Sequence, residues 1–312
     1  MMGGLLTEAF ATALVAGAVT AGIPLLLAAL GEQISEKAGV LNVGLEGMML
    51  MGAFTGFSTA LATGSIWAGF AAGAVAGVAS AGIMAVLCVL LGLNQIVIGI
   101  ALTLGAEGLT ALLHHFRFAR SYPSLGVKDS LRIPLLSDIP VVGRGLFDHH
   151  PMAYVAVILV FAMAALYRRT GLGLSLRAAG EKSAALDVAG VDVFAVRSFA
   201  VLATGALAGI GGAFMAEVGA GIFVPFLTSG NGFIAIVLAM LARGRPTWVM
   251  AGAFLFGACL SMATALQVAG VNLPTDVIQM LPFAAVMIVL VIFGRRAGLP
   301  AELGVPYVRG QR

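Results

Sequence analysis

The chain has 312 residues, of which 60 % are hydrophobic and only 10 % are charged, and its mean hydropathy is +1.06. A water-soluble globular domain carries about 25 % charged residues, so this composition excludes a soluble enzyme and places the chain in a lipid bilayer. The net charge of +3 is small, which indicates basic loops at a membrane surface rather than binding of nucleic acid.

Apolar runs predict an all-α protein that crosses the membrane many times, because about 20 apolar residues span a bilayer as a helix. About nine spans (eight to ten) are expected, at 9–30, 41–63, 66–91, 96–113, 152–167, 197–219, 231–242, 248–268 and 278–293. The seventh run is too short to cross as a straight helix, so it is expected to be broken or re-entrant. The first run is longer than the core of a signal peptide, about 7–15 residues, and is expected to remain as a span.

Small residues predict where two of these spans pack closely. Gly69, Gly73 and Gly77 recur every four residues in the third run, and Gly205 and Gly209 do the same in the sixth. Residues four apart lie on one face of a helix, and small side chains there allow the backbone of a neighbouring helix to approach.

The distribution of Lys and Arg predicts the orientation of the chain, because basic residues are in excess in cytoplasmic loops. With the N-terminus outside and nine crossings, the C-terminus is cytoplasmic. The loops on the cytoplasmic side then hold Lys37, Arg168, Arg169, Arg177, Lys182, Arg243, Arg245, Arg295 and Arg296. The long outer loop, 116–150, also holds basic residues, and such long loops obey the rule poorly.

No catalytic or metal-binding motif occurs in the sequence. There is no glycine-rich phosphate loop followed by Lys and Ser or Thr, so the chain is not expected to hydrolyse ATP. The histidines form two adjacent pairs, His114/His115 and His149/His150. Neighbouring residues on a helix point apart, so neither pair is expected to chelate a metal.

Polar side chains within the apolar runs are the main candidates for function, since a polar or charged group facing lipid is costly. These residues are Asn42, Glu46, Asn94, Gln95, Glu107, Glu217 and Asn231. Each is expected either to line a polar path for a solute or to form a hydrogen bond between helices. For Glu46 the neighbouring glycines favour the second role, whereas both roles stay open for Glu107 and Glu217.

The segment LRAAGEKSAALDVAGVDV, residues 176–193, predicts a short helix outside the bilayer. A helical wheel from 181 to 189 places Ala184, Ala185, Val188 and Ala189 on one side, and Ser183 and Asp187 opposite. Gly180 and Gly190 bracket the helix as residues that readily end helices. A helix of about nine residues is not stable alone, and small side chains with mixed charge suit a groove on another protein better than a lipid surface. The alternative is an ordinary solvated loop.

Four stretches resemble the permease subunits of ABC importers for branched-chain amino acids, simple sugars and nucleosides. The stretches are GLGLSLRAAGEKSAALDVAGVDV (171–193), EKAGVLNVGLEGMMLMGAF (36–54), IPLLSDIPVVG (133–143) and GFIAIVLAMLARGRP (232–246). The second and third are most similar to the nucleoside branch. The first departs from the family at Lys182 and Ser183, where relatives often have Asn or His followed by Pro.

The resemblance implies one transmembrane permease domain, 1–312, with the ABC importer fold, in the bacterial cytoplasmic membrane. It implies that this subunit has no cofactor and forms a nucleoside path with a second, different permease subunit. ATPase subunits would hold ATP and Mg²⁺, and an extracytoplasmic solute-binding protein would deliver the solute. Loop 170–196 would be the cytoplasmic coupling loop that contacts the ATPase, through Arg177, Gly180, Glu181, Ala184, Ala185, Val188 and Gly190.

Other functions stay open at this point. Within the same family, the solute is alternatively a simple sugar or a branched-chain amino acid. The membrane composition alone also allows a secondary transporter that needs no ATPase, or a structural membrane scaffold.

Overall fold

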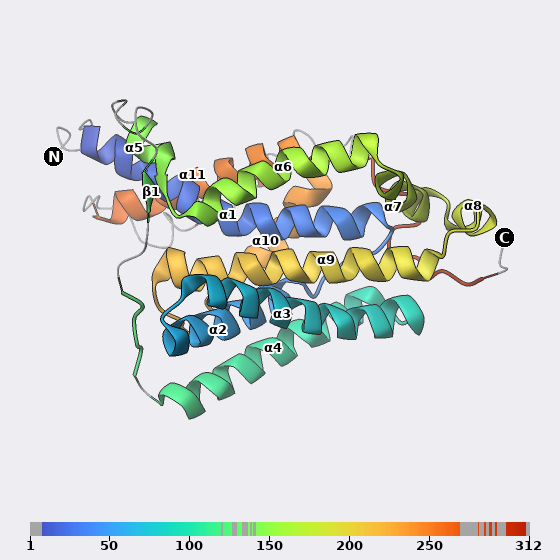
Figure 1. Cartoon of the computed structure of the whole chain (residues 1–312), viewed down its shortest axis with the longest axis horizontal. Helices are drawn as coiled ribbons and strands as arrows, with labels where there is room; N and C mark the ends of the chain where they lie inside the picture. Colours follow the sequence, from blue (N-terminus) through green and yellow to red (C-terminus); the bar gives the residue numbers. More distant parts are fainter. Residues whose placement is uncertain are drawn as a thin grey trace.

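The computed structural model describes residues 8–119, 121–126, 130–132, 137, 139, 142–268, 280, 284, 287–288, 291 and 298–309. Long helices lying side by side form a bundle (Figure 1). The helices are α1 (Glu8–Lys37), α2 (Leu45–Thr63), α3 (Ile66–Met84), α4 (Gln95–Phe118), α5 (Val142–Phe147), α6 (Pro151–Arg169), α7 (Gly171–Glu181), α8 (Ser183–Val188), α9 (Val193–Phe214), α10 (Asn231–Leu241) and α11 (Pro246–Val268). Two wider, π-helical segments, η2 (Ala85–Leu90) and η3 (Met215–Ala220), continue α3 and α9.

The two ends of the bundle carry different small elements. At one end, β1 (Leu131–Arg132) pairs antiparallel with β2 (Asp148–His149), beside α5. At the opposite end lie α7, α8 and the C-terminus (Figure 1). The all-α prediction is therefore correct for the bundle. It misses the pair of two-residue strands in the long loop between α4 and α6.

Six helices in the described part of the chain are long and apolar enough to cross a membrane. They are Phe10–Lys37, Ile66–Leu90, Gln95–Phe118, Pro151–Arg169, Val193–Ala220 and Pro246–Leu266. They correspond to six of the nine predicted spans, and the chain is an all-helical, multi-pass membrane protein.

The other three predicted spans have different outcomes. The second corresponds to α2, which has 19 residues but is not among the helices apolar enough to count as a span. The seventh is α10, with only 11 residues. At about 1.5 Å per residue α10 covers roughly half of a hydrocarbon core about 30 Å thick, so the expectation that it is too short to cross is confirmed. The ninth, 278–293, lies mostly outside the described residues.

Several helices begin at a residue whose side chain accepts hydrogen bonds from the first turn. Such N-caps satisfy backbone N–H groups that have no partner within the helix. The capping residues are Ser65 for α3, Asn94 for α4, Thr170 for α7 and Asp192 for α9.

Glycines bring α2, α3 and α9 into direct backbone contact. A Cβ atom on Gly77 would collide with the carbonyl oxygen of Gly205, and one on Gly209 would collide with that of Gly73. A Cβ atom on Gly212 would likewise strike the carbonyl of α2 residue Met49. The predicted close packing of the third and sixth spans is confirmed, and it extends to α2.

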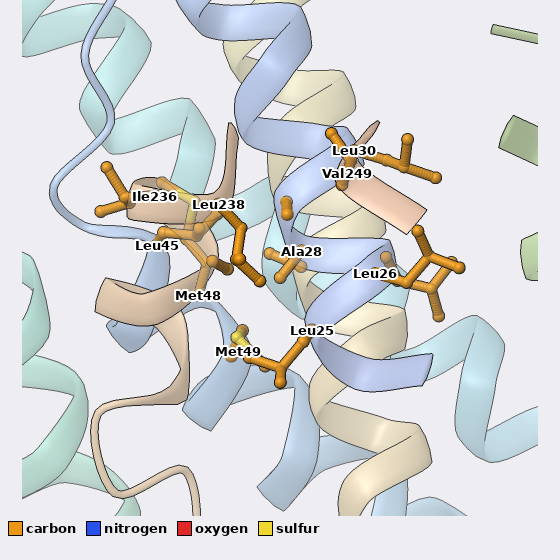
Figure 2. Packing of buried hydrophobic residues seen from close by; sticks show 14 of the residues in the cluster. Leu25, Leu26, Ala28, Leu30, Leu45, Met48, Met49, Ile236, Leu238 and Val249 are labelled. Carbon is orange, nitrogen blue, oxygen red and sulfur yellow. The ribbon is translucent and has the colours of Figure 1, made fainter. Parts of the chain in front are cut away.

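Apolar side chains from α1, α2 and α10 meet in the core of the bundle (Figure 2). Leu25 and Leu30 of α1, Met48 and Met49 of α2, and Leu238 of α10 are all buried. The short helix α10 is thus held against two longer helices, although it cannot span the membrane by itself.

Candidate translocation and coupling sites

Glu46 fastens the start of α10 to α2. Its side chain is buried, and its two carboxylate oxygens accept hydrogen bonds from the backbone N–H groups of Gly230, at 2.8 Å, and Gly232, at 2.5 Å. A carboxylate at this position also interacts favourably with the positive end of the helix dipole. Both oxygens are therefore used in holding α10, which supports a helix-to-helix role for Glu46 rather than contact with a solute.

Asn231, the first residue of α10, lines a cavity of about 280 Å³. Its amide nitrogen lies 3.7 Å from the sulfur of Met215, at the start of η3. Thr20 and Pro24 of α1 and Leu260 of α11 form the other walls. The cavity thus lies where the broken helix, the π-helical segment and two long helices meet.

Glu217 is the second buried carboxylate of this region, and its environment differs from that of Glu46. Its side chain is fully buried in η3, and neither oxygen has a hydrogen-bond partner among the described residues. The carboxylate lies against Gly56 of α2 and Gly69 of α3, and a Cβ atom on Gly69 would collide with it. Glycines of two helices thus provide the space that this carboxyl group occupies.

Asn42, Asn94 and Gln95 differ in what their side chains contact. Gln95 Oε1 accepts a hydrogen bond from the backbone N–H of Leu41 at 2.8 Å, which ties α4 to the turn after α1. Asn94 is exposed and caps its own helix, α4. The Asn42 amide nitrogen lies 3.4 Å from the Met48 sulfur, and its buried oxygen has no hydrogen-bond partner among the described residues.

Glu107 stands apart from the other candidates. Its side chain is partly buried on α4 and has no hydrogen bond or ion pair with any residue that the structure describes. The same helix exposes large apolar side chains, including Leu104 and Phe116. Glu107 therefore makes no hydrogen bond with Glu46 or Glu217.

The sequence reasoning missed a buried polar group at the end of α1. Glu32, Gln33 and Glu36 were outside the predicted span 9–30, but α1 continues to Lys37 and buries all three. Next to Glu32 in the sequence, the Gly31 carbonyl accepts a hydrogen bond from the Thr204 hydroxyl of α9 at 2.6 Å. The polar sequence GEQISEK resembles a loop, and only its helical spacing of Glu32 and Glu36 indicated that the helix continues.

The predicted nine-residue helix in the coupling segment is two helices. α7 ends at Glu181 and α8 begins at Ser183, with a break at Lys182. Gly180 is buried inside α7 rather than ending a helix, which corrects one predicted boundary, whereas Gly190 follows α8 with a left-handed φ of 83°. Arg177 and Glu181 are exposed.

One face of α8 is open to solvent, as the wheel predicts. Ala185 is exposed and Val188 is 90 % exposed, while Ala184 is intermediate. The opposite side, with Ser183 and Asp187, is covered by residues 298–309. This cover was not anticipated, because nothing in the sequence around 183 points to a partner more than a hundred residues away.

A family model for "Branched-chain amino acid transport system / permease component" matches residues 14–291, nearly the whole chain. The chain belongs to this family. It is accordingly the membrane-embedded, non-enzymatic permease component of an ABC transporter, a class that works with ATPase subunits and a solute-binding protein.

Several permeases are similar to this chain over most of its length. A putative glucose ABC transporter permease protein of Haloferax volcanii is 38 % identical, with 89 % of this chain and 84 % of the relative aligned. A nucleoside ABC transporter permease protein of Lactococcus lactis is 32 % identical, with 96 % and 97 % aligned. A guanosine ABC transporter permease protein of Bacillus subtilis is 31 % identical, with 93 % and 94 % aligned. No solved structure matches the permease.

Proposed function

We propose that the chain is the permease subunit of an ATP-driven importer that carries nucleosides across the bacterial cytoplasmic membrane. The observation that carries this proposal is the end-to-end similarity to a nucleoside and a guanosine permease, which aligns nearly the full length of both proteins. The sequence stretches 36–54 and 133–143 point to the same branch.

Glucose is the second candidate solute. The putative glucose permease of Haloferax volcanii has the higher identity, 38 %, over a somewhat smaller share of the chains. Both solutes are neutral and rich in hydrogen-bonding groups, so a cavity lined by the Asn231 amide and the Thr20 hydroxyl suits either. Nucleosides additionally carry a flat base, which stacks on aromatic or apolar walls.

The proposed path runs beside the start of α10. Asn231 offers an amide to the cavity between α1, η3, α10 and α11, and Glu217 lies in the adjoining segment with no partner among the described residues. Polar groups buried in a bundle are costly unless they serve a wet route or a partner. Glu46 and Gln95 support this route by tying together the elements around it, and Asn42 supplies a second buried polar atom without a partner among the described residues. Asn94 caps α4, and Glu107 lies farther along the same helix.

The proposed contact with the ATPase is the exposed face of α7 and α8. Ala184, Ala185 and Val188 form a small apolar surface, and Arg177 and Glu181 supply charges at its edge. An almost fully exposed valine in water favours an apolar groove on a partner. ATP binding would move this face and switch the spans between outward and inward access, which requires different affinities for the two states.

The proposed orientation places the α7–α8 end in the cytoplasm. Lys37 lies over the Tyr167 ring at 4.6 Å from its centroid, and a Cβ atom on Gly244 would collide with the Lys37 ammonium group. The ends of α1 and α6 and the α10–α11 turn are therefore neighbours, so their basic residues gather at one end, as expected for a cytoplasmic face. In this scheme the whole chain is one transmembrane domain, paired with a second, different permease subunit, and loop 116–150 faces the solute-binding protein.

Uptake by proteoliposomes tests the solute. The permease is reconstituted with its second permease subunit, ATPase subunits and receptor, and uptake of radiolabelled guanosine, uridine and glucose is measured with and without ATP. ATP-dependent guanosine or uridine uptake that excess glucose does not inhibit is expected. Glucose uptake without nucleoside uptake would instead support the second candidate, and uptake by the permease alone would indicate a secondary transporter.

A further inference from the structure

Residues 298–309, called the C-terminal strap below, join three parts of the bundle end. The backbone N–H of Glu302 donates to the carbonyl of Gly180, at the end of α7, at 2.8 Å. The backbone N–H of Gly304 donates to the carbonyl of Gly39, in the turn after α1, at 3.0 Å. Pro306 lies next to Gly92, in the turn between η2 and α4.

The Glu302 carboxylate is the central contact of the strap. It accepts hydrogen bonds from the backbone N–H of Ser183, at 3.1 Å, and from the Ser183 hydroxyl. The Arg197 guanidinium of α9 donates to the same carboxylate at 3.3 Å. One acidic side chain thus connects the first residue of α8 to a membrane-spanning helix.

Arg197 is buried and reaches both the strap and α7. Its side chain donates to the carbonyl of Val305 at 2.7 Å and to that of Ala179 at 3.0 Å. An arginine that bridges two backbone segments and a carboxylate holds all three in a fixed geometry. The ring of Tyr307 adds an apolar contact, with its centroid 5.3 Å from that of Phe194 in α9.

α8 depends on these contacts for its position. It has six residues, and a helix that short is not stable alone. Its buried side is made by Ser183, which meets Glu302, and Leu186, which belongs to a small apolar cluster that Tyr307 packs against. Farther along α8, Asp187 pairs with Arg309 of the strap at 2.9 Å, but this pair is exposed to water and adds little to the position of α8. The partly buried bond between Ser183 and Glu302 is therefore the main tie between α8 and the strap.

We propose that the C-terminal strap transmits displacement of α8 to α9 and α1, with Glu302 and Arg197 as positioning residues. The inference rests on the proposed contact of α7 and α8 with an ATPase. α8 meets the rest of the structure through its neighbours in the chain, α7 and α9, and through the strap, which also donates a hydrogen bond to the turn after α1. Without the Glu302 bridge, α8 would still meet its partner and stay joined to α7 and α9 through the backbone, but its first residue would lose its side-chain connection to Arg197 of α9.

The test measures how much solute is carried for each ATP hydrolysed by the reconstituted importer. Glu302→Ala is expected to lower this ratio about tenfold, within the range typical of coupling between two sites. Glu302→Gln keeps an acceptor for Ser183 and should recover part of the ratio. Arg309→Ala is the matched control, because it removes an exposed pair on the same strap and should leave the ratio within about twofold.

A second variant keeps the proposal falsifiable if Glu302→Ala does not assemble. Ser183→Pro removes both bonds to Glu302 yet suits the first residue of a helix, and it should lower the ratio while ATPase subunits still co-purify. A normal ratio in the variant that assembles would overturn the proposal. If the unmodified importer itself does not couple ATP hydrolysis to uptake, the proposed function fails instead, so the two failures are distinct.

Discussion

Glu46 and Glu217 are both buried carboxylates in apolar segments, yet they differ in their hydrogen-bond partners. Glu46 receives two backbone N–H groups from the start of α10, whereas Glu217 has no hydrogen-bond partner among the described residues. In sequence, both are single glutamates between small and apolar residues. Their difference arises from what the rest of the chain places opposite them.

The comparison separates a structural role from a functional candidate. Removing Glu46 would leave one buried donor, the N–H of Gly232, and one partly buried donor, that of Gly230, without an acceptor, which costs stability. Removing the Glu217 carboxylate would break no hydrogen bond to a described residue, so its effect should appear in transport rather than in folding. The predictions below test this division.

The largest effect is expected for Glu46→Ala. Two backbone N–H groups at the start of α10 would lose their acceptor, which should lower the free energy of unfolding by about 3 kcal/mol. The change is measured by thermal unfolding in detergent, with the loss of monodisperse protein as the signal for unfolding. Glu46→Gln retains one acceptor oxygen and should be intermediate. An Ala variant as stable as the unmodified protein would contradict the role of Glu46 in holding the start of α10.

A smaller loss of stability is expected for Gly69→Ala, because the new methyl group would meet the Glu217 carboxylate. Overpacking of this kind costs about 1–3 kcal/mol. The double variant Gly69→Ala/Glu217→Ala should recover part of this loss, since the two residues are in contact and their effects should not add. The same unfolding assay applies, and simple additivity would show that the two side chains do not compete for this space.

Glu217→Gln should change stability by less than about 1 kcal/mol, because volume is kept and no hydrogen bond to a described residue is broken. Nucleoside uptake should nevertheless fall clearly, because the carboxyl group is proposed to serve the solute path and an amide offers one acceptor oxygen in place of two. The matched control is Glu107→Gln on α4, where uptake is expected to fall less. Unchanged uptake in Glu217→Gln, with normal assembly, would reduce Glu217 to a packing group.

Hydropathy predicted the membrane spans well because the bilayer imposes length and apolarity on each helix. Six spans and the shortness of α10 follow from that constraint, and the glycine spacing in α3 and α9 predicted their close packing. The approach of α2 to α3 and α9 was not predicted, although Gly52 and Gly56 have the same four-residue spacing as Gly205 and Gly209.

The contacts that define the candidate sites could not be predicted, because they join distant parts of the sequence. The partner of Glu46 follows it by 184 residues, and the partner of Ser183 by 119. Polar residues at the end of α1 were assigned to a loop because composition changes before the helix ends. Hydrogen bonds of this kind depend on how distant segments pack together, and the periodicity within one segment contains no information on that packing.

The smallest effect concerns a carboxylate that is paired in water rather than in the bundle. The hydrogen bond from Arg309, with a lesser one from Tyr307, lowers the pKa of Asp187 below its ordinary value. Because this pKa is lowered in the folded protein, the contact stabilises the fold fully at pH values above the unfolded-state pKa of about 3.9. The stabilisation is lost as the pH falls through the folded-state pKa.

Arg309→Ala should return the pKa of Asp187 toward its ordinary value, which a carboxyl-carbon NMR titration measures. Exposed pairs contribute little and are screened by salt, so nucleoside uptake at neutral pH should stay nearly unchanged, in contrast to uptake by Glu217→Gln. A large loss of uptake in Arg309→Ala would instead place this exposed pair, and not only the Glu302 bridge, in the coupling of α8 to the membrane helices.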